Sequence, residues 1–570
     1  MSRECAIQLN NFLQQPKYCN LAVQSKMRLT RRVLVVEDDV KFWESRIPGL
    51  LPDSDWQVKF ATTVQEAEQI FRKDCDFDLL IVDYQLGSRT GREFLKFARK
   101  IDRNIPILLF SDEPSQKGFD IRDIDTYKTL PFVDKSDCLA NPQKAAAKIK
   151  ESYEEYMVTM CTPQIQSEYG QLRTVLVHTP SDEIDKIEPN DPWYLIDSRP
   201  ALHLAQQEHL GFIRAIKENS LRPIVLDIGL LLYDVLKSLQ GQQLREVVEN
   251  ILFDWEFQTL TNRLAKHNLE LSPLLGEKID EICSNDPKTI TFWLMCGLNI
   301  ADLLGKDAEH PMRKQRDCQI VAPVPNLYFM RDPGFVLGES LVLSRMYWSV
   351  RRREPSILRT VINYHPFMKN AKSQAIDWDL NSGEEFFIEG GDVMVVTPNN
   401  FAIALSERTS RQAVRRVAQE LLNRGAERVF QPMIPAKRAF IHLDTVCSVV
   451  GQEHIVVHPE AVSAYADTFC WTSKTFESGG EPESLNMDFI SVLHHQFNKN
   501  IIEVRDASEQ FDDAVNVFMI NPDTAVAYDR NPKANKALRN NGIHVVEFSG
   551  SDLVVGRGGA RCMTMPIRRD

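Results

Sequence analysis

The sequence lacks the features of an exported, disulfide-bonded or membrane-spanning protein. It contains no run of about eighteen apolar residues, and polar side chains interrupt residues 1–30, where a signal peptide would need an apolar core. Its eleven cysteines include no Cys-x-x-Cys pair, so no zinc or redox site of that kind is indicated. An odd number of scattered thiols is typical of a reducing compartment. We therefore expect a cytoplasmic protein that does not contact membranes.

Positive charge is also scarce. Lysine and arginine number 67 against 79 aspartate and glutamate residues, which gives a formal net charge of −12. Such a chain is not drawn to phosphate backbones, and no helix-turn-helix or aromatic and basic surface stands out. We therefore expect no nucleic-acid partner. The hydrophobic content of 43% is ordinary for a folded protein, and the length of 570 residues corresponds to more than one domain.

The first part of the chain alternates between strand-like and helix-like segments. Residues 33–36, 79–82 and 105–110 are continuous apolar runs of the kind found in buried parallel strands. Apolar residues with helical spacing lie between these runs. The pattern predicts an α/β fold with a doubly wound parallel sheet over residues 31–140, after a polar lead of residues 1–30. Asn141 followed by Pro142 resembles a helix start, so we expect residues 141–164 to form a linker helix.

The second part of the chain repeats a strand, a tight turn and a strand. A new alternating region begins at residues 173–178, and the pattern becomes helical from about 230 to 304. A helix is also expected over 410–423. The repeated hairpins follow at residues 335–343, 392–405, 446–458 and 517–528. Such repetition suggests a radially repeated architecture.

Acidic and hydroxyl side chains follow the strands of the first region. Glu37 and Asp38 follow the first apolar run, Asp83 ends the second, Ser111 ends the third, and Lys135 lies after a further short strand. Since the carboxyl ends of parallel strands meet at one edge of a sheet, we expect these groups to converge. Clustered carboxylates favour Mg²⁺, a carboxylate can attack phosphorus, and the lysine and serine could hold phosphoryl oxygens.

This region resembles the receiver domain of response regulators over its whole length. The resemblance implies that Glu37 and Asp38 bind Mg²⁺ together with Asp83, that Asp83 is the phosphoacceptor, and that Ser111, Phe132 and Lys135 are switch residues. It also implies a histidine kinase or phosphotransfer protein as a partner. The sequence departs from the family at Ser136, where receivers usually have proline. Two alternatives stay open: ordinary solvated loop acids, and a domain that mediates association without phosphorylation.

Four segments in the second half gather residues suited to a planar cation. They surround Asp332, Glu389, the His442-Leu-Asp444 run and Cys562. Residues two apart in an extended strand share a face, so we expect His442 and Asp444 to point into one pocket. A guanidinium pairs bidentately with carboxylates, and its central carbon is electrophilic.

The residue types indicate nucleophilic catalysis. Cys562 can attack as a thiolate, provided that Arg557, Arg561 or a cationic substrate favours ionisation. His442 can then donate a proton to departing ammonia and activate water. The glycines at 558 and 559 allow close approach of the backbone to the substrate.

Residues from about 165 to 570 resemble arginine deiminase, a five-bladed α/β propeller family with a helical insertion that corresponds to about 230–304. The resemblance is carried by Phe329-Met-Arg-Asp332, Glu389-Gly-Gly-Asp392, His442-Leu-Asp-Thr445 and Arg561-Cys-Met563, in that order. Met330 stands where the family often has threonine. The resemblance implies L-arginine as substrate, a homo-oligomer, no cofactor for catalysis, Cys562 as nucleophile, His442 as acid and base, and a guanidinium held by Asp332, Glu389 and Asp444. It further implies substrate binding by Phe329, Asn326, Arg351, Arg408 and Arg557, the last four at the substrate carboxylate.

These observations lead to the hypothesis of an enzyme that hydrolyses L-arginine to L-citrulline and ammonia and is regulated through the fused receiver-like region. One alternative is an amidinotransferase that uses the same cysteine. Another is a non-catalytic arginine sensor in a two-component system. Individually, Arg351, Arg352 and Arg353 could also form a solvated basic patch.

Overall fold

The computed structural model describes residues 30–570 except 53–54, 75, 87–88, 112–121, 188–191, 254–270, 300–301, 303–318, 379–385, 463, 466 and 478–479. The expected lead over residues 1–29 and parts of the expected helical insertion lie outside the described residues. Among the helices that are described, none combines the length and the apolar character needed to cross a bilayer.

A parallel sheet forms the first part of the structure, as the alternating pattern predicts. Its strands, in spatial order, are β2 (Trp56–Ala61), β1 (Arg31–Val36), β3 (Leu79–Asp83), β6 (Ile107–Ser111) and β7 (Val133–Asp134). We call it the N-terminal sheet. This strand order is one of the two common doubly wound arrangements, in which ligands bind outside the carboxyl ends of the strands.

Helices cover both faces of the N-terminal sheet. The first face packs against α5 (Val64–Lys73) and α6 (Gly91–Ile101). The second packs against α4 (Ile47–Leu50) and α9 (Pro142–Met160), whose core continues into the rest of the molecule. Smaller elements complete this region: α3 (Val40–Trp43), β4 (Gln85–Leu86), β5 (Arg89–Thr90), α7 (Arg122–Tyr127) and α8 (Lys135–Ala140).

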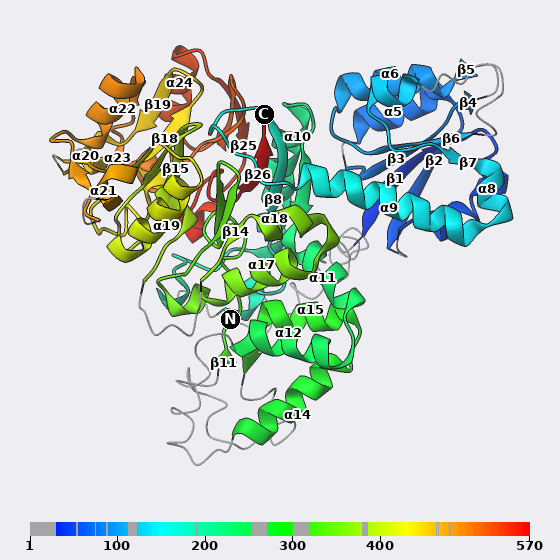
Figure 1. Ribbon diagram of the computed structural model, residues 1–570, viewed down its shortest axis with the longest axis horizontal. Coiled ribbons are helices and arrows are strands. Elements are labelled where there is room, and N and C mark those ends of the chain that lie inside the picture. The colour runs from blue at the N-terminus through cyan, green and yellow to red at the C-terminus, as the bar shows by residue number, and fades with distance from the viewer. Residues whose placement is uncertain are drawn as a thin grey trace, which may run out of the picture.

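The helix expected after Asn141 is α9. Asn141 is its N-cap, because the Asn141 side chain accepts a hydrogen bond from the Lys144 backbone N–H at 3.1 Å. Figure 1 shows α9 leaving the N-terminal sheet and reaching the remainder of the chain near β8.

Five further sheets repeat a single pattern, and we call them the repeated sheets. In each, two antiparallel strands are followed by a third strand parallel to the second. The fifth joins the last strand of the chain to two early ones. The sheets are β12 (Gly334–Leu337), β13 (Ser340–Leu343), β14 (Ala375–Ile376); β15 (Val393–Thr397), β16 (Asn400–Ile403), β17 (Arg428–Gln431); β18 (Cys447–Val450), β19 (His454–Val457), β22 (Asn500–Glu503); β23 (Phe518–Asn521), β24 (Thr524–Tyr528), β25 (His544–Phe548); and β26 (Met565–Arg569), β8 (Leu172–Val177), β9 (Ile224–Asp227). The second also carries β20 (Phe469–Trp471) and β21 (Glu483–Ser484).

Helices connect and cover the repeated sheets. They are α10 (Leu202–Glu218), α17 (Arg353–Tyr364), α18 (Lys369–Ser373), α19 (Arg411–Asn423), α20 (Pro459–Val462), α21 (Ser473–Glu477), α22 (Phe489–Phe497), α23 (Ala507–Phe511) and α24 (Pro532–Asn540). The helix expected over 410–423 is α19, which Ser410 caps by accepting from the Ala413 N–H.

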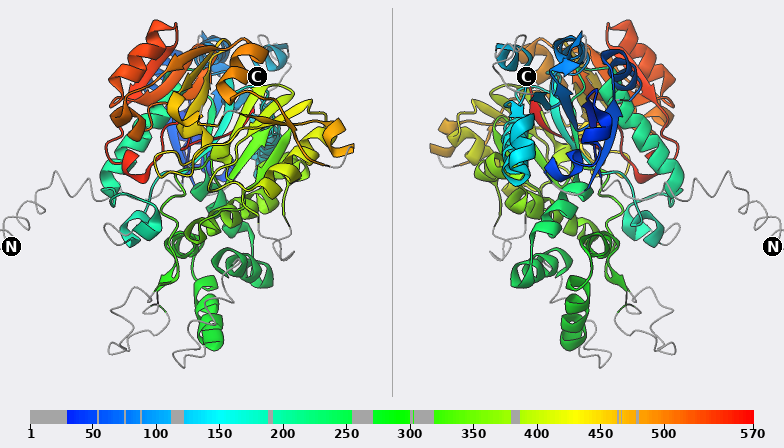
Figure 2. Two further views of the ribbon diagram at one scale, coloured as in Figure 1. Left: turned by 90° about the vertical axis from the view of Figure 1, so that its left-hand side faces the viewer. Right: turned by 90° about the vertical axis from the view of Figure 1, so that its right-hand side faces the viewer.

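The expected helical insertion is a group of helices on one side of the molecule. It comprises α11 (Ile228–Ser238), α12 (Gly241–Phe253), α14 (Leu271–Cys283) and α15 (Pro287–Cys296). Helices α12 and α14 project below the repeated sheets in Figures 1 and 2. After α15, β10 (Leu298–Asn299) pairs with β11 (Gln319–Val321).

The N-terminal sheet contacts the rest of the chain through the amino ends of its strands. Arg31, the first residue of β1, pairs with Asp234 of α11. Asp55, directly before β2, pairs with Lys237 of the same helix. Asn104, in the loop before β6, donates to the Leu221 carbonyl at 2.9 Å. The carboxyl ends of these strands therefore lie at the opposite edge from this interface.

Candidate active site

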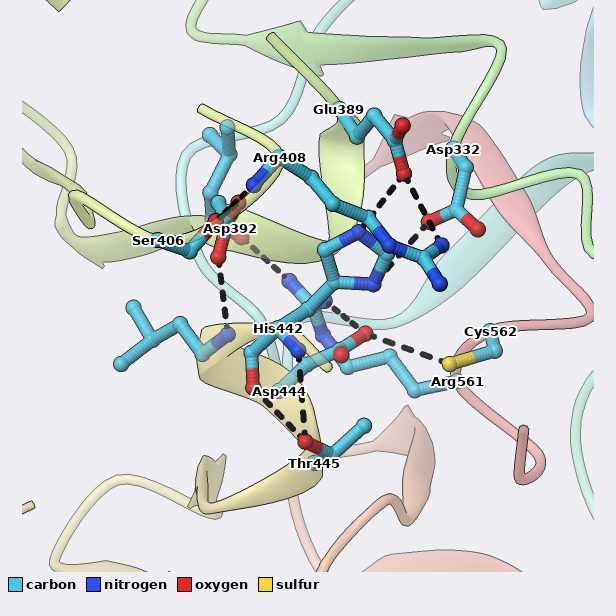
Figure 3. A network of polar contacts seen from close by, with 12 residues as sticks. Asp332, Glu389, Asp392, Ser406, Arg408, His442, Asp444, Thr445, Arg561 and Cys562 are labelled. Atoms are coloured by element: carbon cyan, nitrogen blue, oxygen red, sulfur yellow. Dashed lines mark hydrogen bonds and ion pairs between the residues drawn. The ribbon is translucent and has the colours of Figure 1, made fainter. Parts of the chain in front are cut away.

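Five side chains from four segments form one buried polar network (Figure 3). Each segment directly precedes the first strand of a repeated sheet: β12, β15, β18 or β26. All five side chains are at most 3% exposed, and they are Asp332, Glu389, His442, Asp444 and Cys562. The structure thus brings together every residue that the sequence analysis placed at the guanidinium.

The local backbone at His442 differs from the expected strand. Residues Leu443–Thr445 form a 3-10 turn, with His442 as its N-cap. The prediction that His442 and Asp444 share a strand face is therefore wrong, and the turn brings the two residues into the network instead. Close approach also requires glycine at 391, because a Cβ there would lie 2.5 Å from His442 Nδ1.

His442 is held between two carboxylates. Its Nε2 lies 2.8 Å from Glu389 Oε2, and its Nδ1 lies 3.7 Å from Asp332 Oδ1. Burial alone would lower the pKa of His442, but the charges of Asp332 and Glu389 outweigh burial and raise this pKa to about 9. The imidazole is therefore protonated at neutral pH and can act as an acid.

Cys562 lies in an acidic environment. Its Sγ is 3.6 Å from Asp444 Oδ2. Burial raises the pKa of the Cys562 thiol well above its ordinary value, and the charges of Asp444, Asp332 and Asp513 raise it further. The cysteine is consequently a thiol at neutral pH, and a cation near these carboxylates would favour the thiolate.

Each carboxylate assigned to the guanidinium pairs with an arginine of the chain itself. Arg351 Nη1 lies 2.6 Å from Asp332, and Arg408 Nη1 lies 3.3 Å from Glu389. Arg561 Nη1 lies 2.8 Å from Asp444. Burial would raise the pKa of Glu389, but Arg408, His442 and Arg351 lower it to about 2. These carboxylates are therefore arranged to hold guanidinium groups.

Arg351 and Arg408, two of the expected carboxylate-binding residues, thus lie in the network. Arg351 is 2% exposed and also binds Glu354, the second residue of α17. Arg353 is buried as well and donates to the Ile251 carbonyl. The interpretation of residues 351–353 as a solvated basic patch is therefore wrong for Arg351 and Arg353.

The other expected substrate-binding residues contact different neighbours. Asn326 donates to the Tyr194 carbonyl at 2.8 Å. Phe329 is buried against the glycine loop, where a Cβ at residue 558 would lie 2.3 Å from its ring. Arg557 stacks over Phe511, with 3.6 Å between its Cζ and the ring centroid. Its Nη1 donates to the Phe511 carbonyl.

Three acidic residues that support the network were not given a role from sequence. Glu168 binds the Arg561 Nη2 at 3.0 Å, so it fixes the partner of Asp444. Asp392 accepts from the Leu443 N–H at 3.1 Å, so it holds the turn after His442. Glu354 orients Arg351. Asp392 lies within a recognised motif, and Glu354 directly follows the arginine run 351–353, whereas Glu168 has no nearby motif that would have identified it.

A second acidic cluster lies at the carboxyl ends of the N-terminal sheet. Lys135 Nζ is 2.8 Å from Glu37 Oε2 and 2.9 Å from Asp83 Oδ2. Ligand atoms of Glu37, Asp38 and Asp83 lie within 4.8 Å of one another. Burial raises the pKa of Glu37 to about 7 and also raises that of Asp83. Three hard oxygen donors, two of them buried, fit a Mg²⁺ ion.

The remaining predicted residues of this cluster lie nearby in the sheet. Ser111 is buried at the end of β6 and pairs in register with Asp134 of β7. Phe132 packs against the core on the α5 and α6 side. Ser136 donates its backbone N–H to Asp134, the N-cap of α8, which is compatible with serine in place of proline.

Comparisons with known proteins show which family the chain is similar to. The arginine deiminase family model matches residues 194–569. Arginine deiminase of Listeria monocytogenes serotype 4b (strain CLIP80459) is 32% identical over 421 residues, which cover 71% of this chain and 97% of the relative. The Staphylococcus haemolyticus enzyme of the same name is 30% identical over 428 residues, with 71% and 98% coverage.

Two solved structures are similar at lower identity. A ternary complex of AgrE with ornithine and NAD⁺ has a TM-score of 0.41 and 13% identity, and covers 70% of this chain and 39% of that chain. A DDAH variant from Pseudomonas aeruginosa in complex with citrulline has a TM-score of 0.39 and 15% identity, with 69% and 99% coverage. The family model and the sequence relatives decide the assignment: the chain belongs to the arginine deiminase family and is a hydrolase that acts on carbon–nitrogen bonds.

Proposed function

We propose that the enzyme hydrolyses free L-arginine to L-citrulline and ammonia through a covalent intermediate on Cys562. One observation carries the proposal: a thiol, a protonated histidine and three carboxylates with arginine partners share one buried network. Membership of the arginine deiminase family supports the same chemistry.

The substrate binds by exchange of one guanidinium for another. Its guanidinium replaces the side chains of Arg351 and Arg408 on Asp332 and Glu389, while Asp444 stays paired with Arg561 and turns its free oxygen toward the substrate. The released arginines, together with Asn326 and Arg557, then meet the substrate carboxylate. Because arginine side chains and substrate share the same fork of donors, the exchange keeps the carboxylates paired.

In the first half of the reaction, the Cys562 thiol loses its proton to solvent once the cationic substrate is bound, and the resulting thiolate attacks the guanidinium carbon. A carbon–sulfur bond forms, the bond to one terminal nitrogen breaks, and His442 gives its proton to the departing ammonia. The product on the enzyme is a thiouronium cation. The substrate's positive charge supports this step, because it offsets the carboxylates that keep the thiol protonated.

In the second half, neutral His442 takes a proton from water, whose oxygen bonds to the same carbon. The carbon–sulfur bond then breaks, which restores the thiolate and releases citrulline. The second proton of the water passes to solvent, where it converts the released ammonia into ammonium, so the overall reaction is argininium plus water to citrulline plus ammonium. Charge and atoms balance without a cofactor.

A product assay tests the proposal. Purified protein is incubated with arginine, agmatine or an arginine peptide, each with and without glycine. Citrulline and ammonia from arginine, lost in Cys562→Ser, are expected. Ornithine formed only with glycine would instead identify an amidinotransferase, and arginine binding without turnover would identify a sensor.

We also propose a domain organisation and a regulatory role for the N-terminal sheet. Residues 31–140 are a receiver-like domain, 141–164 a linker helix, and 165–570 a five-bladed α/β propeller. In the receiver-like domain, Glu37, Asp38 and Asp83 would hold Mg²⁺, which would neutralise charge around a phosphoryl group. Lys135 would bind a phosphoryl oxygen, and phosphorylation of Asp83 would alter turnover at the repeated sheets.

Helix α17 supports a route for such regulation. Its second residue, Glu354, binds Arg351 in the active site. At its other end, His365 Nε2 lies 3.5 Å from Asp234, the partner of Arg31 in the N-terminal sheet. Helix α17 therefore contacts the buried polar network at its first turn and contacts Asp234, the partner of Arg31, at its C-cap.

A further inference from the structure

Asn516 contacts the reacting sulfur, although the sequence analysis assigned it no role. It lies two residues before β23 and is 1% exposed. Its Nδ2 lies 3.0 Å from Cys562 Sγ and 3.1 Å from the Asp444 carbonyl. Its Oδ1 accepts a hydrogen bond from the Cys562 backbone N–H at 3.0 Å.

The surrounding donors fix the orientation of this amide. The Cys562 N–H can only donate, so it must face the amide oxygen. The amide nitrogen then necessarily faces the sulfur and the Asp444 carbonyl. Both hydrogens and the oxygen of Asn516 are used, and rotation of the amide would break all three contacts.

The loop that carries the cysteine packs tightly against Asn516. A Cβ at Gly559 would lie 2.7 Å from the Asn516 carbonyl oxygen and 2.8 Å from its Oδ1. Glycine at this position therefore allows the contact between the loop and Asn516. Asn516 thus holds both the backbone N–H of Cys562 and the sulfur of its side chain.

The electrostatics around the sulfur give the amide hydrogen a chemical role. Asp444, Asp332 and Asp513 all disfavour a negative sulfur. A neutral N–H donor favours the thiolate without adding a positive charge that would repel a guanidinium. Asn516 is suited to this position because lysine or arginine there would oppose the binding of a cationic substrate.

The position of Asn516 in the repeated sheets agrees with this role. Asp332, Asp392, Asp444 and Cys562 all lie one to three residues before the first strand of their sheets. Asn516 has the corresponding place before β23, the one sheet from which no catalytic side chain had been assigned. All five repeated sheets therefore contribute to one site.

We propose that Asn516 is a catalytic residue that donates a hydrogen bond to the Cys562 thiolate and aims its sulfur at the guanidinium carbon. This inference rests on the proposed function, but the measurement that decides it, alkylation of Cys562, does not require turnover.

Asn516→Asp is the sharpest test. Aspartate keeps an oxygen for the Cys562 N–H, removes the donor to sulfur and adds a negative charge. The rate of Cys562 alkylation by iodoacetamide is followed against pH by mass spectrometry of the Cys562 peptide. We expect the midpoint of the rise in alkylation rate with pH to lie at a higher pH in Asn516→Asp than in wild type. We also expect kcat for arginine to fall by about 10²- to 10³-fold, the usual effect of removing one donor to a reacting anion, while KM changes far less.

Asn535→Asp is the matched control. Asn535 is a fully buried asparagine of α24 that donates to the Tyr528 carbonyl in the same sheet, away from the sulfur. We expect Cys562 in the Asn535→Asp variant to be alkylated with the same pH midpoint as in wild type. If Asn516→Asp fails to fold, Asn516→Ser replaces it, since serine can donate to sulfur and should react more like wild type than Asn516→Ala does.

An unchanged alkylation midpoint in folded Asn516→Asp, or equal shifts in Asn516→Ser and Asn516→Ala, would overturn the inference. Absence of citrulline from wild type would count against the proposed function instead. The alkylation comparison would still decide whether Asn516 stabilises the thiolate.

Discussion

At the scale of single residues, the chief feature is charge matching inside a buried site. Asp332, Glu389 and Asp444 each pair with an arginine side chain. Leaving any of them buried and unpaired would cost several kcal/mol. A cationic substrate that exchanges with these arginines avoids that cost, whereas a neutral product such as citrulline does not. The same arrangement therefore favours release of the product.

The protonation state of His442 should set the high-pH limit of activity. Its pKa of about 9 means that the protonated form, which the first step needs, is lost as pH rises through 9. We expect kcat/KM for arginine, which reports ionisation of the free enzyme, to fall over that range in a pH–rate profile of wild type. His442→Ala should lower kcat by about 10²- to 10⁴-fold, the usual worth of general acid–base catalysis.

The control for this prediction is His454→Ala on β19, which should retain the wild-type profile. If the residual activity of His442→Ala still falls at the same high pH, the ionisation that limits activity there belongs to another group.

Arg351 should distinguish substrates by their carboxylate. Arg351→Lys keeps the charge but loses the planar fork. Because a hydrogen bond to a charged group contributes about 1.5–3 kcal/mol, kcat/KM for arginine should fall by about 10- to 150-fold. Agmatine has no carboxylate, so its kcat/KM should change much less. Equal losses for the two substrates would place Arg351 at the guanidinium end instead.

The sequence predicts the reacting residues better than the residues that support them. Cys562, His442 and the three carboxylates lie in short motifs whose chemistry is recognisable. Glu168 and Glu354 act through arginines. Glu354 lies three residues from its partner Arg351, whereas Glu168 and its partner Arg561 come from distant segments that no local pattern connects. For Asn516 the sequence offers one signal: it lies directly before the predicted hairpin at 517–528, and the site residues of the other repeats also lie shortly before their hairpins.

At the scale of elements, buried strands were predictable and edge or turn structure was not. The apolar runs at 33–36 and 79–82 lie within β1 and β3, and the run at 105–110 overlaps β6 from Ile107 onward. Strand β2 was missed because it alternates between exposed and half-buried residues at the edge of the N-terminal sheet. The 3-10 turn after His442 was missed because it depends on side-chain capping and on Asp392, which is distant in sequence.

The carboxyl ends of β8 and β9 contain a buried ion pair that should make stability depend on pH. His178 is fully buried, with its Nε2 3.1 Å from Glu183 and its Nδ1 3.7 Å from Asp227. Burial would lower the pKa of His178, but these two acids raise it to about 10. An unfolded histidine has a pKa near 6.5, so the folded state binds the extra proton between about pH 6.5 and 10.

The stabilisation from His178 is therefore complete below about pH 6.5 and is lost as pH rises toward 10, at up to about 1.4 kcal/mol per pH unit. His178→Leu should lower the free energy of unfolding at pH 7 by about 3–5 kcal/mol, because the buried Glu183 and the partly buried Asp227 lose their partner. Urea unfolding at several pH values measures both effects. His544→Leu, an exposed position on β25, is the control, and a steep pH dependence retained by His178→Leu would contradict the assignment.

At the scale of the whole molecule, the acidic cluster of the N-terminal sheet and its interface lie at opposite strand ends. Asp83, Glu37 and Lys135 are at the carboxyl ends of the strands. Arg31, Asp55 and Asn104 are at the amino ends and contact the helices of the second half. If phosphorylation of Asp83 regulates turnover as proposed, its effect has to pass through the sheet or along α9 before it reaches Arg31 and α17.

Asp234 is the residue at which this communication can be interrupted. Asp234→Asn removes the charge that pairs with Arg31 and faces His365, while it keeps the size of the side chain. With Mg²⁺ and beryllofluoride as a phosphoryl mimic, wild type should change its kcat or KM for arginine by about 5-fold or more, the usual range of coupling between sites. Asp83→Asn should abolish the response because it removes the acceptor, and Asp234→Asn should abolish it with basal turnover preserved. Asp377→Asn, which breaks the Arg359 ion pair of α17 away from Asp234, should respond as wild type does. A full response of Asp234→Asn to beryllofluoride would contradict this route. It would show that the mimic at Asp83 alters turnover even when the Arg31–Asp234 ion pair is absent.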